Sequence, residues 1–154
     1  MRVSILVVGR PRSPGLADAI VDYETRAARY WPLEVVEVKE EPARGASVDQ
    51  VRDREAERLL GRLDRDAQMV ICDPGGVAMD STAFAQMLAS YRDRAQSVAF
   101  VIGGAYGLGE PVRQRATRRL SLAPWTLPHE LARLVLAEQL YRAGTIVRGE
   151  PYHK

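Results

Sequence analysis

The chain has 154 residues, of which 46% are hydrophobic and 27% charged, and these proportions fit one globular domain with a core of its own. No apolar run approaches the length of a membrane span, and residues 1–8 are too short for a signal peptide. The single cysteine excludes an internal disulfide, and two histidines are too few for a typical zinc site. The net charge is +2, but residues 111–154 carry +5 and residues 1–110 carry −3, so an anionic partner such as nucleic acid would dock on the C-terminal part, unless that part is merely a solvated basic face. We therefore expect a cytoplasmic protein with neither a membrane span nor a metal.

Strands and helices alternate through the first half of the chain. In order, we predict a strand at residues 3–8, a helix at 16–30, a strand at 33–38 and a helix at 48–63. The charged segment 39–47 contains Pro42 and Gly45 and is the best candidate for a mobile loop. Ser47 or Asp49 is suited to cap the helix that follows.

The alternation continues in the second half. In order, we predict a strand at 68–72, a helix capped by Asp80 or Ser81, a strand at 98–102, a helix from Pro111 to about Arg119, a strand at 120–122 and a helix from Glu130 to about Thr145. The polar tail, residues 147–154, is expected to fray. This order of elements is typical of an α/β fold with a mostly parallel sheet flanked by helices.

The segment Ser97–Gly109 carries the strongest indication of a binding site. Its apolar run ends at Gly103 and Gly104, and two more glycines follow at positions 107 and 109. Glycines at the carboxyl end of a strand allow a tight turn and a close approach of a ligand to the backbone. A plain turn between a strand and a helix explains them equally well.

Two further loops, residues 73–76 and 123–128, also follow predicted strands. Ligands of open α/β sheets bind at the carboxyl ends of the strands, so we expect these loops to wrap a nucleoside-like ligand. The apolar walls would be Leu122, Trp125 and Leu127. The first strand lacks the G-x-G-x-x-G pattern after it, which argues against a nicotinamide or flavin enzyme.

Four runs between residue 100 and the C-terminus, in fixed order, resemble one family, and the resemblance extends over the whole chain. They are Phe100–Leu108, Leu120–Leu122 with Thr126–His129, Leu134–Ala143 and Pro151–His153. The family is the ribosomal RNA large subunit methyltransferase H family, of the SPOUT class. The resemblance implies a single SPOUT methyltransferase domain over residues 1–154, with a C-terminal trefoil knot and S-adenosylmethionine as cofactor. It also implies a homodimer that methylates ring nitrogen 3 of a pseudouridine in 23S ribosomal RNA on the assembled ribosome.

The resemblance also assigns the cofactor contacts, position by position. They would be Cys72, Gly103, Leu122, Ala123, Pro124, Trp125, Thr126 and Leu127. Two positions depart from the family. Members often have Leu where Cys72 stands, and we expect this thiol to be a small buried side chain rather than a nucleophile. Ala105 and Tyr106 replace the Pro-Glu of some members, so no acidic role is assumed in that loop.

Methyl transfer from a sulfonium depends on positioning and on removal of the proton from the acceptor nitrogen. We expect His153 to act as base or orienter, Tyr152 to stack on or hydrogen-bond the acceptor, and Arg142 to balance charge. Plainer explanations are that the tail packs against a dimer partner and that Arg142 pairs with Glu138 one helical turn away. His129 fits the amino end of the last helix better than the chemistry. Phosphate contacts are predicted at Arg10, Arg113, Arg118, Arg119 and Arg148.

Two other functions fit the same residues. A non-catalytic ribosome-binding protein would keep the basic surface without needing the cofactor loops. A SPOUT methyltransferase would keep the cofactor and act instead on transfer RNA or free ribosomal RNA. A homodimer is expected from the last helix as well, because its apolar residues cover more than one face.

Overall fold

The computed structural model describes residues 1–154, and strands alternate with helices along the chain. In chain order the elements are β1 (Val3–Val8), α1 (Pro14–Ala27), β2 (Leu33–Val38), α2 (Val48–Leu60), β3 (Gln68–Ala78), α3 (Ser81–Asp93), β4 (Val98–Ile102), α4 (Glu110–Arg115), β5 (Arg118–Ser121) and α5 (His129–Val147). The strand order is β2-β1-β4-β3-β5, and every pairing is parallel. The predicted α/β fold is confirmed, and its sheet is parallel throughout.

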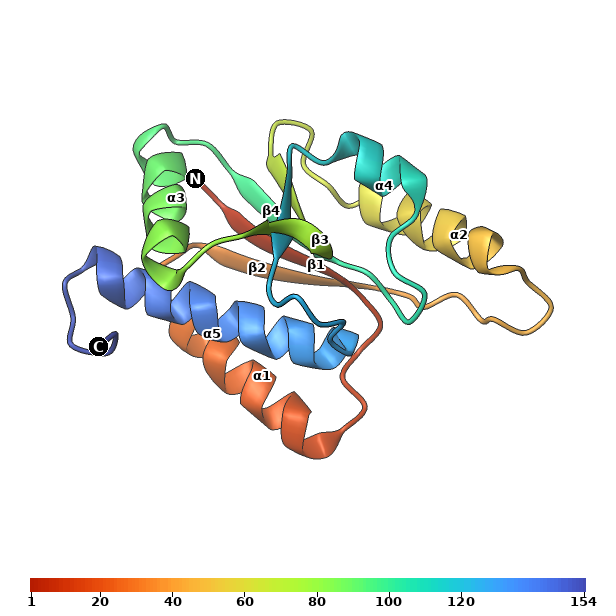
Figure 1. The fold of residues 1–154 in the computed structure, drawn as a ribbon, viewed down its shortest axis with the longest axis horizontal. Coiled ribbons are helices and arrows are strands. Elements are labelled where there is room, and N and C mark those ends of the chain that lie inside the picture. Colours follow the sequence, from red (N-terminus) through yellow and green to blue (C-terminus); the bar gives the residue numbers. More distant parts are fainter.

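Helices cover both faces of this sheet. The helices α1, α3 and α5 lie on one face, and α2 and α4 lie on the other (Figure 1). Each face of the sheet carries a hydrophobic core of its own. Alternate residues of β1 contribute to the two cores, because successive side chains of a strand point to opposite faces. Ile5 and Val7 pack with residues of α1, α3 and α5, whereas Leu6 and Val8 pack with residues of α2 and α4. Each of the four is at most 3% exposed, as expected for a central strand of an all-parallel sheet.

Two helices begin at the predicted caps. The hydroxyl of Ser47 accepts the amide of Gln50 at 3.1 Å, and the side chain of Gln50 accepts the amide of Ser47 at 2.9 Å, which forms a capping box. The carboxylate of Asp80 accepts the amide of Ala83 at 2.7 Å. The ends of α1, α2 and α5 differ from the predicted ones by one to three residues. None of the helices combines the length and the apolar character needed to cross a bilayer.

The strand β3 is longer than predicted. It continues to Ala78 instead of ending at Cys72, with an irregularity between Cys72 and Val77. Val77 pairs with Leu120 of β5, so the two strands stay together beyond the irregularity. A side chain at Gly76 would place a Cβ 2.7 Å from the carbonyl carbon of Arg119, so a glycine is required for this approach. The segment 73–76 is therefore a bulge within a strand rather than a loop after one.

The chain leaves α4 earlier than predicted. The helix ends at Arg115 and β5 begins at Arg118, whereas we expected the helix to reach Arg119. Thr117 explains the difference, because its amide and its hydroxyl both donate to the carbonyl of Met69 in β3, at 2.8 and 3.0 Å. These two bonds start the strand pairing before another helical turn can form.

Candidate cofactor site and C-terminal tail

A cavity of about 500 Å³ opens between the irregularity in β3 and the carboxyl ends of β4 and β5. Seven of the eight predicted cofactor contacts line it: Cys72, Gly103, Leu122, Ala123, Trp125, Thr126 and Leu127. The eighth, Pro124, lies in the same loop but is not part of the cavity wall. Seven of the predicted cofactor contacts therefore lie around one cavity.

The turn after β4 consists of glycines for steric reasons. A side chain at Gly103 would place a Cβ 2.8 Å from the carbonyl carbon of Gly107, closer than real Cβ atoms approach. Gly107 has a φ of +80°, in the left-handed region that favours glycine. Its amide donates to the carbonyl of Gly104 at 3.0 Å and closes the turn. Because this tight turn also forms a wall of the cavity, the two explanations of the glycines are compatible.

Asp73 organises another part of the cavity wall. Its carboxylate accepts hydrogen bonds from Arg113 at 2.5 Å, from Arg119 at 2.6 Å and from the amide of Gly75 at 3.0 Å. Burial alone would raise the pKa of Asp73, but the hydrogen bonds and the charge of Arg113 outweigh it and lower the pKa to about 2. Arg113 and Arg119, which we predicted as phosphate contacts, are engaged by this carboxylate. Sequence reasoning missed the cluster because its members lie 40 and 46 residues apart.

The cavity combines apolar side chains with exposed backbone. Leu122 and Leu127 pack against the hydrophobic core, whereas Trp125 is 77% exposed. Burial raises the pKa of the Cys72 thiol to about 12, so this side chain is a neutral apolar contact, as expected, and not a nucleophile. The volume, the apolar walls and the accessible backbone at Gly103 suit a ligand of nucleoside size, and S-adenosylmethionine fits that description.

The last residues fold back on α5 around Glu138, so the expectation of a frayed tail is wrong. The phenol of Tyr152 donates to Oε1 of Glu138 at 3.0 Å, and Nη2 of Arg142 donates to the same oxygen at 2.6 Å. The guanidinium of Arg142 lies 4.7 Å from the centroid of the Tyr152 ring, and its Nη1 lies 3.3 Å from Nδ1 of His153. The three predicted catalytic residues therefore lie together. The predicted ion pair between Arg142 and Glu138 is also present, and Glu138 connects the group in a way that the sequence did not indicate.

The surroundings of Glu138 keep two of these groups protonated. The hydrogen bond to Glu138 raises the pKa of Arg142, and burial together with the hydrogen bond to Glu138 raises the pKa of Tyr152. Neither side chain can therefore remove a proton near neutral pH.

The tail and the cavity lie at opposite ends of α5. His129 begins the helix, as predicted, and lines the cavity, whereas Arg142 lies thirteen residues further on. At 1.5 Å per residue the helix separates them by about 20 Å. Figure 1 shows the C-terminus beyond the far end of α5. The tail of one chain therefore does not reach the cavity of the same chain.

Comparison with known proteins identifies the family. A family model described as "Predicted SPOUT methyltransferase" matches residues 1–153. The chain is 71% identical over 154 residues to Ribosomal RNA large subunit methyltransferase H of Gemmatimonas aurantiaca, with both chains covered completely. It is 47% identical, again over all of both chains, to the protein of the same name from Anaeromyxobacter sp. strain Fw109-5.

Solved structures share the fold at low sequence identity. A probable methyltransferase from Bordetella pertussis matches with a TM-score of 0.56 and 19% identity, covering 93% of this chain and 94% of that one. A probable methylase family protein from Haemophilus influenzae matches with a TM-score of 0.53 and 15% identity, covering 99% of this chain and 70% of that one. Together with the full-length relatives, these findings show that the chain belongs to the SPOUT methyltransferase family, among the ribosomal RNA large subunit methyltransferases H.

Proposed function

We propose that the chain is an S-adenosylmethionine-dependent methyltransferase that modifies ring nitrogen 3 of a pseudouridine in 23S ribosomal RNA, on assembled ribosomes in the cytoplasm. The observation that carries the proposal is the 500 Å³ cavity lined by seven of the eight predicted cofactor contacts. The full-length relatives named for ribosomal RNA methylation support the acceptor class. In this proposal residues 1–154 form one domain, and its C-terminal part is knotted as the family resemblance implies.

The cavity residues would bind and orient the cofactor, which supplies a methyl group on a positively charged sulfur. Backbone groups of the turn at Gly103 and of the loop 123–128 would hold its polar atoms. Leu122 and Leu127 would cover its apolar parts and exclude water. Because the thiol of Cys72 stays neutral, we infer direct transfer to the acceptor without an intermediate on the protein.

The tail would complete the cavity of a second copy of the chain. Arg142, Tyr152 and His153 lie together but about 20 Å from the cavity of their own chain, measured by the rise of α5. In a homodimer, His153 would orient the acceptor or accept its proton, and the ring of Tyr152 would stack on the acceptor base. Arg142 would stabilise negative charge on that base. The exposed side chains of Arg10, Arg118 and Arg148 are suited to phosphate contacts.

Transfer of labelled methyl groups tests the proposal. Ribosomes that lack the modification would be compared with free 23S ribosomal RNA and with transfer RNA, while calorimetry follows binding of S-adenosylmethionine. Labelling of ribosomes alone supports the proposal, and labelling of free RNA or transfer RNA keeps the chemistry and replaces the acceptor. Cofactor binding without labelling of any acceptor contradicts the acceptor assignment. Absence of cofactor binding would contradict the proposal and favour the alternative function, that of a non-catalytic ribosome-binding protein.

A further inference from the structure

A second cavity, of about 800 Å³, borders the same glycine turn as the cofactor cavity. Its walls come from the loop after β1, the segment after β2, the helix α2, and Ala105 with Tyr106 in the turn. Ala105 lines both cavities. No predicted cofactor contact lies in this second cavity, so the proposed function gives it no role beyond a phosphate contact at Arg10.

Glu55 of α2 lines this cavity with a buried carboxyl group that has no charged partner. The residue is 3% exposed, and its Oε1 atom has no hydrogen-bond partner. Its Oε2 atom accepts only the amide of Glu41, at 3.1 Å. Buried polar atoms without a partner are rare in folded proteins and call for an explanation.

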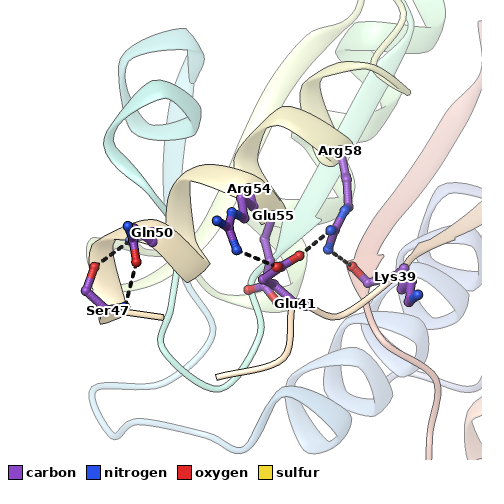
Figure 2. Close-up of polar contacts among 7 residues, drawn as sticks. All are labelled: Lys39, Glu41, Ser47, Gln50, Arg54, Glu55 and Arg58. Carbon is purple, nitrogen blue, oxygen red and sulfur yellow. Dashed lines mark hydrogen bonds and ion pairs between the residues drawn. The ribbon is translucent and has the colours of Figure 1, made fainter. Parts of the chain in front are cut away.

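The nearby cations are engaged by another carboxylate. Arg54 donates to Glu41 at 2.9 Å, and Arg58 donates both to Glu41 and, at 2.8 Å, to the carbonyl of Lys39. Figure 2 shows that both guanidinium groups reach Glu41 while the carboxyl of Glu55 lies behind it. Burial, the first cause, and the charge of Glu40 raise the pKa of Glu55, although Arg58 and the amide of Glu41 act in the opposite direction. The raised pKa makes this carboxylate a stronger proton acceptor than an exposed glutamate.

The carboxyl group of Glu55 lies directly against the turn that lines the cofactor cavity. A Cβ at Gly104 would come within 2.9 Å of Oε1 of Glu55 and within 3.1 Å of Cγ1 of Val8. Only the absence of a side chain at Gly104 leaves this oxygen room, and the turn covers it in the free chain. The helix α2 also supports the turn, because Arg52 donates to the carbonyl of Tyr106 at 2.6 Å.

We propose that the second cavity receives the base of the acceptor nucleotide and that Glu55 accepts the hydrogen of the reacting ring nitrogen. This inference rests on the proposed function, and it assigns the proton to Glu55, so that His153 of the partner subunit orients the acceptor and does not take its proton. The matching ligand is a pyrimidine with an imide N–H between two carbonyl groups, and it enters as the turn at Gly104 shifts away from the carboxyl group. The N–H bond breaks and its proton passes to Oε1 of Glu55. The nitrogen then forms its new bond to the methyl carbon while the methyl–sulfur bond breaks and leaves its electron pair on sulfur.

The rim of the cavity suits a nucleotide as well. Arg10 pairs with Glu37 at 3.2 Å and Arg12 with Glu40 at 2.8 Å, and both arginine side chains are largely exposed. Lys39 forms no ion pair, so its ammonium group is free for a phosphate. Arg10 and Arg12 already pair with carboxylates of the cavity wall, so Lys39 is the cation left to meet a phosphate at one end of a ligand whose N–H donor meets Glu55.

Nuclear magnetic resonance on the wild-type protein tests the inference without turnover. The carboxyl carbons of glutamate side chains are labelled with ¹³C, and the probes are the nucleosides pseudouridine and 3-methylpseudouridine at millimolar concentration. Pseudouridine should shift the Glu55 resonance, and 3-methylpseudouridine, which lacks the reacting N–H, should shift it at least about tenfold less, since the hydrogen bond is lost. Equal shifts with both nucleosides, or no shift with either, overturn the inference.

Kinetics of Glu55→Gln provide the second test. Single-turnover methyl transfer should fall about 10²- to 10⁴-fold, the range typical of a general base. The wild-type rate should decrease as the pH falls below the pKa of Glu55, and the variant should lose this dependence. The charges that shift the pKa of Glu55 are those of Glu40, Arg58 and Glu41. The other charged or titratable groups around it are Glu37 and Lys39 at the end of β2, Arg54 on α2, Arg10 and Arg12 after β1, and Tyr106 in the turn.

The matched control is Glu57→Gln, on the exposed side of the same helix. It should keep the wild-type rate, and both variants should keep the wild-type affinity for S-adenosylmethionine within about twofold, because neither Glu55 nor Glu57 lines the cofactor cavity. Wild-type rates and pH profile in Glu55→Gln would overturn the role of Glu55 and leave the methyltransferase intact. Absence of transfer by the wild-type protein would instead defeat the proposed function. If Glu55→Gln does not fold, the resonance experiment on the wild-type protein decides.

Discussion

At position 103 the chain has no room for a side chain. In Gly103→Ala the new Cβ would lie 2.8 Å from the carbonyl carbon of Gly107, and the turn after β4 must open. We expect the affinity for S-adenosylmethionine to fall at least about tenfold. The overlap distorts the turn that binds the ligand, and this distortion should cost at least about 1.4 kcal/mol of binding free energy. Calorimetric titration measures the loss. The control is Gly15→Ala, where a Cβ meets no atom within 4 Å, and equal affinities of the two variants would contradict the assignment.

Asp73 should make the stability of the protein depend on pH in an acidic window. Its pKa is 3.8 ordinarily and about 2 in the folded chain. The unfolded chain therefore binds more protons in this range, so the stabilisation is complete above about pH 4 and is lost as the pH falls through about 2. Asp73→Asn should remove this dependence and lower the melting temperature at neutral pH by about 4 °C or more, since Arg113 and Arg119 lose their partner.

Urea unfolding midpoints between pH 2 and pH 7 measure the effect of Asp73. Asp53→Asn serves as the control, because Asp53 is an exposed residue of α2 that forms no ion pair. The control should follow the wild-type curve. Coincident curves for the two variants would show that the ion pairs of Asp73 do not stabilise the fold.

Among the elements, the tail and α5 depend on each other through Glu138. Glu138→Gln should weaken the bonds from Tyr152 and Arg142, because an amide oxygen carries no charge. We expect residues 150–154 to become mobile and methyl transfer to fall at least about tenfold. Cofactor affinity should stay unchanged, because no predicted cofactor contact belongs to the tail, which meets the acceptor in the proposed dimer. Heteronuclear relaxation of the tail amides and calorimetry separate these effects, and an ordered tail in the variant would contradict the role of Glu138.

The elements also show what the sequence predicts and what it does not. The strands β1, β2 and β4 match the predicted residues, because each is a short apolar or β-branched run bounded by turn residues. The extension of β3 was not predictable, since Val77 and Ala78 gain strand partners only from β5, more than forty residues later. The fold of the tail depends in the same way on contacts between Tyr152 and α5.

In the candidate site, too, local patterns predict some residues, whereas contacts between distant segments could not be predicted. Glycines after a strand and the family resemblance indicated the residues that line the cofactor cavity. The ion pairs of Asp73 and the buried carboxyl of Glu55 join segments that are distant along the chain, and local patterns carry no information on such contacts. Charged residues on a helix look like a solvated face until the structure shows that one of them is buried.

For the molecule as a whole, the separation of cavity and tail is the argument for a dimer. One chain holds both parts, yet α5 keeps them about 20 Å apart by its rise per residue. Several apolar residues of α5 stay partly exposed, among them Leu131, Leu134 and Val135. A second copy packed on these residues would exclude them from water and bring its tail to the cavity. Light scattering at micromolar concentration should give twice the mass of one chain.

A mixing experiment distinguishes a shared site from two independent ones. Gly103→Ala is designed to disable the cavity and His153→Ala the tail, so each variant alone should transfer little methyl. In a dimer that exchanges tails, half of the mixed molecules are heterodimers, and each heterodimer keeps one site with an intact cavity and an intact tail. Mixing after subunit exchange should therefore restore about a quarter of the wild-type sites. If each cavity used the tail of its own chain, every site in the mixture would carry one defect and no activity would return. A monomer in light scattering, or no recovery on mixing despite exchange, would refute the shared site, because a cavity and a tail on different chains can act together only where the chains meet.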